Sequence, residues 1–155
     1  QTLLLAKDKI EAKESGAKWF PYNKGGRFRK WYGNRNHFVN WENNGFDIKN
    51  FIDSKGRKIA AVRNEPFYFR KGITWSDVSS GSFACRYTEE GFVFDMKGSS
   101  GFTSENLYYK IGLLNSKFST TTLSILNPTL SFQVGNIKTI PIRVRLIAKV
   151  SIIFL

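Results

Sequence analysis

The densest group of residues that could do chemistry is a run of basic and aromatic side chains between residues 18 and 41, with no acidic residue before Glu42. Its basic members are Lys18, Lys24, Arg27, Arg29, Lys30 and Arg35. Its aromatic members are Trp19, Phe20, Tyr22, Phe28, Trp31, Tyr32, Phe38 and Trp41. Basic side chains neutralise phosphates and flat rings stack on bases, so this composition indicates a nucleic-acid surface. Gly25 and Gly26 let the backbone approach a phosphate that a side chain would block.

Arg27 and Arg29 are two residues apart, so on an extended segment both point to one face and Phe28 points to the other. We therefore expect Phe28 to be a buried anchor, while Arg27, Arg29 and Lys30 contact nucleic acid. The alternative is that the aromatic residues form the core and the charges form a solvated face. For Trp19, Phe28 and Trp31, core packing explains the sequence at least as well as stacking.

A second set of basic residues is scattered among strand-like runs and consists of Arg63, Arg70, Lys71 and Arg86. Arginine is a residue type that can read guanine edges in the major groove. The same residues are equally compatible with ordinary surface charge, and the sequence does not choose between the two. The predicted DNA-contacting residues are these four together with Lys24, Gly25, Gly26, Arg27, Arg29, Lys30 and Arg35.

The sequence lacks the residue sets that catalysis needs. The sequence has one cysteine, Cys85, and one histidine, His37, which are too few for a zinc site and do not indicate a cysteine nucleophile. We expect Cys85 to be a small buried residue. The stretch Gly98-Ser-Ser-Gly101 has neither the spacing nor the lysine of a nucleotide-binding loop. We therefore predict no catalytic residue, no metal and no cofactor in this chain.

Length and charge fit one basic domain. The chain has 155 residues, and 24 Lys plus Arg against 12 Asp plus Glu give a formal net charge of +12, which predicts attraction to polyanions. A single cysteine excludes an internal disulfide and favours a cytoplasmic location. Residues 137–155 are too often interrupted by proline and charge to span a membrane. The chain begins without methionine, and residues 1–17 are interpreted as the end of a preceding element.

Turn-forming residues separate short β-prone runs at residues 37–41, 66–69, 82–87 and 91–95, and the alternation at 82–87 predicts a strand with one buried face. Apolar residues at helical spacing predict a helix that starts near Thr103 or Ser104, and a second one over residues 117–126 that ends at Asn127-Pro128. Residues 131–142 return to strand character. The predicted fold class is α+β: a twisted, irregular β-sheet region, one or two helices and a closing strand.

The run Lys18-Trp-Phe-Pro-Tyr-Asn-Lys-Gly-Gly-Arg-Phe-Arg-Lys-Trp-Tyr-Gly33, followed by Val39-Asn-Trp-Glu42, resembles the C-terminal region of PglX-type adenine-specific DNA methyltransferases. These enzymes belong to BREX phage-defence systems and are similar to type IIG restriction–modification enzymes. The resemblance continues through Phe92-Val-Phe-Asp95 and Leu126-Asn-Pro-Thr-Leu130 to Ile140-Pro-Ile142. The pair Leu113-Leu-Asn-Ser-Lys117 and Phe132-Gln-Val-Gly135 also resembles target-recognition domains of type I specificity subunits.

The resemblance implies that residues 18–142 are a DNA target-recognition domain. The family's S-adenosylmethionine site and its catalytic Asn/Asp-Pro-Pro-aromatic loop would lie upstream, outside this chain. The whole bacterial protein would methylate adenine N6, and this part would select the site without being an enzyme by itself. After Ile142 the family pattern implies a polar helix, whereas residues 143–155 form an atypical apolar and basic tail.

The expected partners are double-stranded DNA, the rest of the methyltransferase chain and other defence-system subunits, with no membrane. Two alternatives stay open from the residues. The chain could be a protein-interaction module that docks onto other subunits, or an RNA-binding domain, since aromatics among basic residues also suit single strands.

Overall fold

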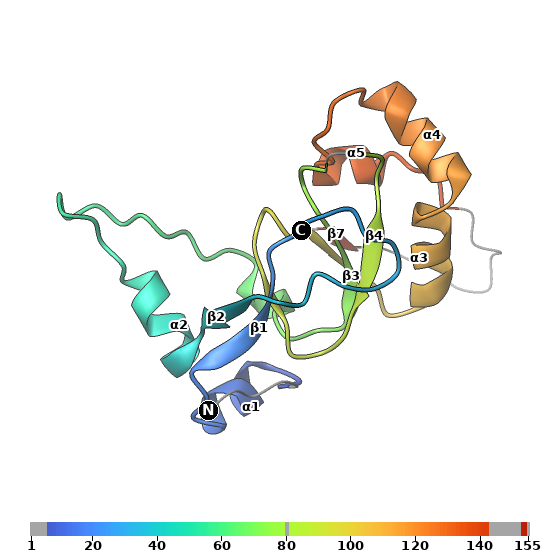
Figure 1. The fold of residues 1–155 in the computed structure, drawn as a ribbon. Coiled ribbons are helices and arrows are strands. Elements are labelled where there is room, and N and C mark those ends of the chain that lie inside the picture. The colour runs from blue at the N-terminus through green and yellow to red at the C-terminus, as the bar shows by residue number, and fades with distance from the viewer. Residues whose placement is uncertain (1–5, 80, 143–152, 155) are drawn as a thin grey trace.

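The computed structural model describes residues 6–79, 81–142 and 153–154 (Figure 1). In this part of the chain the strands form two small sheets, and helices pack beside each of them. The predicted α+β fold class is confirmed. Each sheet has its own cluster of buried apolar side chains, so the molecule has two cores joined through the strands and the loops between them.

The first sheet has three strands in the order β2-β1-β5, with β1 antiparallel to β2 and parallel to β5. Its elements and the helices beside it are α1 (Lys9–Glu14), β1 (Trp19–Asn23), β2 (Phe38–Asn40), α2 (Glu42–Lys49) and β5 (Val93–Phe94). Aromatic rings dominate its core. The Tyr68 ring meets the rings of Trp41 and Phe94 edge-on at centroid distances of 5.0 Å, an arrangement that adds to the stability gained by burial.

The second sheet is antiparallel, in the order β4-β3-β6-β7. Its elements are β3 (Gly72–Trp75), β4 (Cys85–Thr88), β6 (Ser100–Phe102) and β7 (Ile153–Phe154), and Figure 1 shows three helices gathered beside it, α3 (Leu107–Leu114), α4 (Lys117–Leu126) and α5 (Val134–Lys138). The helices bury Ile111, Leu114, Leu123 and Ile137 against this sheet. The Trp75 indole N–H donates to the Phe132 carbonyl at 2.7 Å, which satisfies a buried donor.

The predicted helix over residues 117–126 is confirmed as α4. The Ser116 hydroxyl caps its start by accepting from the Ser119 N–H at 3.3 Å, and the helix ends just before Pro128, as proline requires. The helix before it starts later than predicted, at Leu107. The Thr103 hydroxyl accepts from the Glu105 N–H instead, which keeps residues 103–105 in a local turn.

The strand or extended segment expected at residues 131–142 is wrong for residues 134–138, which form helix α5, whereas Ser131 makes an isolated β-bridge with Val78. The start of α5 is a capping box in which the Gln133 and Asn136 side chains each accept from the other residue's backbone N–H. The strand expected at residues 66–69 is also wrong, since Pro66 opens a 3₁₀ turn, η1 (Glu65–Phe67). Residues 82–87 do include β4, but Cys85 and Arg86 are both buried, so the strand is covered on both faces.

Residues 51–63 leave the body between α2 and η1 as a long excursion (Figure 1, upper left, teal to green). The Asp53 carboxylate closes the turn at its tip by accepting from the Lys55 and Arg57 N–H groups. Phe51, Ile52 and Ile59 are exposed along it. Because these side chains are exposed, the excursion adds little to either core.

Residues 153–154 of the tail form β7 and pair with the edge of β6, so a strand at the edge of this sheet lies beyond residues 131–142, where the closing strand was expected. The other residues of the predicted tail, 143–152 and 155, lie outside the described residues. Among the described residues, no helix is both long and apolar enough to cross a membrane.

Gly98 marks the tightest contact between the two halves of the fold, because a Cβ at this position would lie 1.9 Å from the Asn23 carbonyl oxygen. We predict that Gly98→Ala destabilises the domain by about 3 kcal/mol, since backbone has to move to make room. The control is Gly112→Ala in α3, where the added Cβ meets nothing within 4 Å. This variant should raise the free energy of unfolding by about 0.5–1 kcal/mol, because alanine favours a helix more than glycine does. Chemical denaturation measures both, and equal midpoints for the two variants would contradict the close contact.

Candidate nucleic-acid interface

Residues 24–37 form a long loop between β1 and β2 that crosses to the other sheet. At its middle, the Trp31 N–H donates to the Cys85 carbonyl at 3.0 Å, and the Tyr87 N–H donates to the Trp31 carbonyl at 2.9 Å. These bonds use the free edge of β4, which is the outer strand of its sheet. The loop therefore covers an edge that would otherwise be unpaired, and the edge fixes the position of the loop.

The first turn of the loop is pressed against the body. A Cβ at Gly25 would lie 2.5 Å from the Lys97 carbonyl oxygen, and the φ angle of Gly25 is +83°. Both facts require glycine at this position. The Ser76 hydroxyl then donates to the Gly26 carbonyl at 2.9 Å. The backbone at residues 25–26 is thus held in place by the second sheet.

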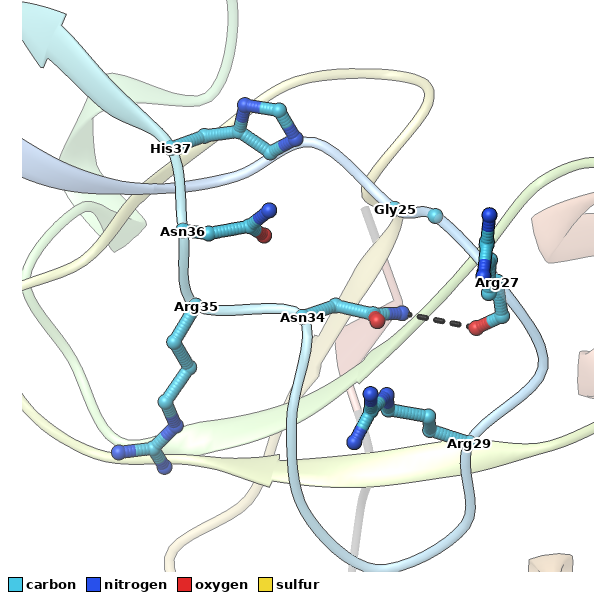
Figure 2. A pocket seen from close by; sticks show the side chains of 8 residues that line it. Gly25, Arg27, Arg29, Asn34, Arg35, Asn36 and His37 are labelled. Carbon is cyan, nitrogen blue, oxygen red and sulfur yellow. Dashed lines mark hydrogen bonds between the residues drawn. The ribbon is translucent and has the colours of Figure 1, made fainter.

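A pocket of about 690 Å³ opens between the two arms of the loop. Its lining residues are Gly25, Gly26, Arg27, Arg29, Asn34, Arg35, Asn36 and His37. Figure 2 shows Asn34, Asn36 and His37 pointing from one arm toward the segment that carries Gly25 and Arg27. The Asn34 amide donates to the Arg27 carbonyl at 2.9 Å and links the two arms. No acidic side chain lines the pocket, so its chemistry suits an anion.

Arg27, Arg29 and Lys24 are exposed, and within the described residues none of them forms an ion pair. Two other predicted residues are engaged. Arg35 pairs with Glu89 and stacks 3.8 Å from the centroid of the Tyr32 ring. The Lys30 ammonium donates to the Asn115 carbonyl at 2.9 Å. The exposed arginines are therefore the groups best placed to meet a ligand, while Arg35 and Lys30 brace the loop.

The aromatic side chains of the loop are exposed, in contrast to the anchor role expected for Phe28. The exposed fractions are 44% for Phe28, 54% for Trp31 and 61% for Tyr32. The expectation was wrong because the loop is held by backbone bonds to β4 and needs no buried ring. Exposed rings beside unpaired arginines are the arrangement that stacks on bases.

The second predicted set of basic residues is not brought together at this pocket. Arg63 and Lys71 are exposed, and Arg70 is exposed with its guanidinium 5.3 Å from the Phe67 ring centroid. Arg86 lies in β4 and is buried. Conversely, the prediction missed Asn34, Asn36 and His37, whose only signal was a polar run next to the glycine turn.

Cys85 is buried in the second core, as expected of a structural cysteine. The Asn115 side chain fixes its backbone, accepting from the Cys85 N–H and donating to the Cys85 carbonyl, each at 3.0 Å. Burial raises the pKa of the Cys85 thiol to about 12. Within the described residues no group of three or more metal-binding side chains is found.

No family model matches the chain. It is 46% identical over 127 residues to the adenine-specific methyltransferase PglX of Lacticaseibacillus casei (strain Zhang), a match that covers 80% of this chain and 11% of that protein. It is 36% identical over 133 residues to the adenine-specific methyltransferase BrxX of Escherichia coli O9:H4 (strain HS), covering 83% of this chain and 10% of that protein. The chain is homologous to one segment of these methyltransferases.

The family resemblance seen in the residues is thereby confirmed. The chain spans about a tenth of the length of the curated relatives that it matches. It therefore corresponds to a small part of a PglX or BrxX protein, and the pocket between residues 25 and 37 is the candidate site within that part.

We predict that the Cys85 thiol does not react with an aromatic disulfide reagent at mildly alkaline pH in the folded protein, and reacts fully once denatured. Burial raises the pKa of the Cys85 thiol in the folded protein above its unfolded value of ~8.5. The free energy of unfolding is therefore unaffected by this thiol below that pH, and it falls as the pH rises further, because only the unfolded chain then loses the thiol proton. The Cys85→Ser variant, which has no thiol, gives the background signal of the reagent. Rapid reaction of the native protein would show that the thiol is accessible.

Proposed function

We propose that this chain is a DNA target-recognition part of a larger adenine-specific methyltransferase of a phage-defence system. The pocket between residues 25 and 37 holds DNA phosphates, and the exposed rings beside it pack against the sugar–base side of the strand. The parent protein would bind S-adenosylmethionine and transfer its methyl group elsewhere in the chain. The similarity to two adenine-specific methyltransferases supports the parentage, and the pocket supports the role of this part.

The observation that carries the proposal is a pocket whose lining includes no acidic residue and two arginines without ion pairs among the described residues, Arg27 and Arg29, while the third, Arg35, pairs with Glu89. A phosphodiester needs charge-assisted donors and close backbone approach, and Arg27, Arg29 and the turn at Gly25 offer both. The net charge of +12 adds long-range attraction for the same polyanion.

RNA binding is the second candidate, and the exposure of Phe28, Trp31 and Tyr32 favours it, because unpaired bases stack on such rings. A duplex offers few free base faces, so the two candidates differ in which nucleic acid binds more tightly. Tighter binding to a single-stranded RNA than to a duplex of the same sequence would replace the first proposal with the second.

We predict that Arg27→Ala/Arg29→Ala weakens binding to a fluorescent DNA duplex without changing the melting temperature. With ~4–6 phosphate contacts in the wild type, log Kd should vary with log salt with a slope of about 4–5, and the double variant should lower that slope by about 2. Fluorescence anisotropy over a salt series measures this. The matched control, Lys55→Ala/Lys58→Ala, removes the same charge from the exposed excursion.

The control variant should lose much less affinity than the pocket variant. Equal losses for the two double variants would mean that only net charge matters and that the pocket is not the contact. An unchanged affinity in Arg27→Ala/Arg29→Ala would remove the pocket from the interface altogether.

We also expect no methyl transfer from this chain alone, because its sequence holds neither a methyl-donor motif nor a catalytic loop. The purified chain is incubated with S-adenosylmethionine and duplex DNA, and N6-methyladenine is measured by mass spectrometry after digestion. Methylation above that of a heat-denatured sample would contradict the expectation.

A further inference from the structure

Arg86 is a buried charge without a partner. Arg86 is 1% exposed. Among the described residues its guanidinium takes part in no ion pair or hydrogen bond. Its Nε atom in particular is shielded from solvent with no acceptor. Buried guanidinium groups are normally paired, because leaving one without an acceptor costs several kcal/mol. The fold therefore retains a donor whose acceptor is missing.

The face on which Arg86 lies follows from the alternation of side chains along β4. Cys85 points to the helices, since its Sγ lies 3.8 Å from the Ile111 carbonyl oxygen in α3. Arg86 and Thr88 therefore point to the opposite face, where the Thr88 hydroxyl accepts from the Asn23 amide at 2.9 Å. Asn23 is the last residue of β1, so Arg86 lies on the sheet face that meets the end of β1, and the loop that follows Asn23 pairs with the edge of β4.

Arg86's cross-strand neighbour points the same way. Thr74, opposite Arg86 in β3, donates its hydroxyl to the Ser99 carbonyl at 3.1 Å. The segment around Lys97 is also what Gly25 is pressed against. The unpaired guanidinium thus lies on the same sheet face as the neutral side chains of Asn23, Thr74 and Thr88. Asn23 is two residues before Gly25, which lines the pocket.

The middle of the loop is held by the two backbone hydrogen bonds of Trp31 and, on either side of it, by Lys30 on the Asn115 carbonyl and Arg35 on Glu89. Trp31 brackets Arg86 with its two backbone hydrogen bonds, to Cys85 on one side and from Tyr87 on the other. Trp31 has a φ angle of +72°, which is unfavourable for a residue other than glycine, and its ring is 54% exposed. Breaking these two bonds would relieve the unfavourable φ angle of Trp31, and its exposed side chain would lose little packing, so this part of the loop can move once Lys30 and Arg35 release their partners.

We propose that Arg86 is the inner half of a phosphate-binding site whose outer half is the pocket between residues 25 and 37. When a phosphate group enters, the loop around Trp31 separates from β4, and the Arg86 guanidinium gains the acceptor that it lacks. Arg27 and Arg29 meet the anion first, and Arg86 binds it after this movement. The inference rests on the proposed function for the source of the phosphate, a DNA strand, but its chemistry applies to any phosphate oxyanion.

The first test is thermal melting with and without inorganic phosphate, with matched sodium chloride as the ionic control. Arg86→Met should melt a few degrees above the wild type without phosphate, because an unpaired buried charge is replaced by an apolar chain of similar length. Phosphate should raise the melting temperature of the wild type but not that of Arg86→Met. The control Arg70→Met, at an exposed arginine, should keep the wild-type rise. A phosphate-dependent rise that is the same in Arg86→Met and wild type would overturn the proposal, as would a wild type that phosphate does not stabilise.

The second test needs no variant and so does not depend on how Arg86→Met folds. Amide hydrogen exchange of the wild type should speed up at Trp31 and Tyr87 when phosphate or a short duplex is bound, since these are the N–H groups of the two bracketing bonds. Amides of the β3–β4 ladder, such as that of Thr74, serve as the internal control. Unchanged exchange at Trp31 and Tyr87 in the bound protein would show that the loop does not move and that Arg86 is not reached.

The outcomes separate this inference from the proposed function. Arg86→Met should bind duplex roughly tenfold more weakly than wild type, the loss expected for one charge-assisted contact. If the wild type binds duplex through Arg27 and Arg29 while Arg86→Met binds equally well, only the role of Arg86 fails. If duplex binding is absent but inorganic phosphate stabilises the wild type through Arg86, the site stands and its proposed DNA source fails.

Discussion

The two hydrogen bonds between Trp31 and β4 are the constraint on which the candidate site depends. A connection as long as residues 24–37, without strands or helices of its own, would otherwise adopt many conformations. Anchoring its midpoint to a strand edge divides it into two short arms, and the pocket is the space between them. The exposed rings of the loop are possible for the same reason, because backbone bonds hold it and the rings are not needed for packing.

The β4 edge that holds the loop is itself bonded to the end of helix α3. The Asn115 side chain bonds both backbone groups of Cys85, the Cys85 carbonyl also accepts from Trp31, and Lys30 reaches back to the Asn115 carbonyl. A single asparagine at the end of α3 thus connects the helical layer, the sheet edge and the basic loop. The loop is thus held by backbone and amide hydrogen bonds together with Lys30 and Arg35, and the charges of Lys24, Arg27 and Arg29 are left for a ligand.

Sequence patterns identified those features whose causes are local. Helix α4 was predicted because apolar residues recur at helical spacing along it and Pro128 ends it, and both signals lie in or beside the helix itself. The turn at Gly25 was predicted because glycine has a strong conformational preference, and the role of the arginines beside it stays a prediction. Burial was harder to predict. The depth of Arg86 and the exposure of Phe28 depend on which strand edge the loop meets, and that contact joins residues more than 50 positions apart.

The excursion at residues 51–63 has a different kind of consequence. Its tip is closed by the carboxylate of one aspartate, and a Cβ added at Gly56 would meet nothing within 4 Å. Phe51, Ile52 and Ile59 are exposed, and Val62, near its end, packs against the first core. Such a segment can gain, lose or exchange residues without cost to folding. It is where descendants of a common ancestor are free to diverge, so lineages that share this scaffold can acquire new surfaces there while the body of the domain stays the same.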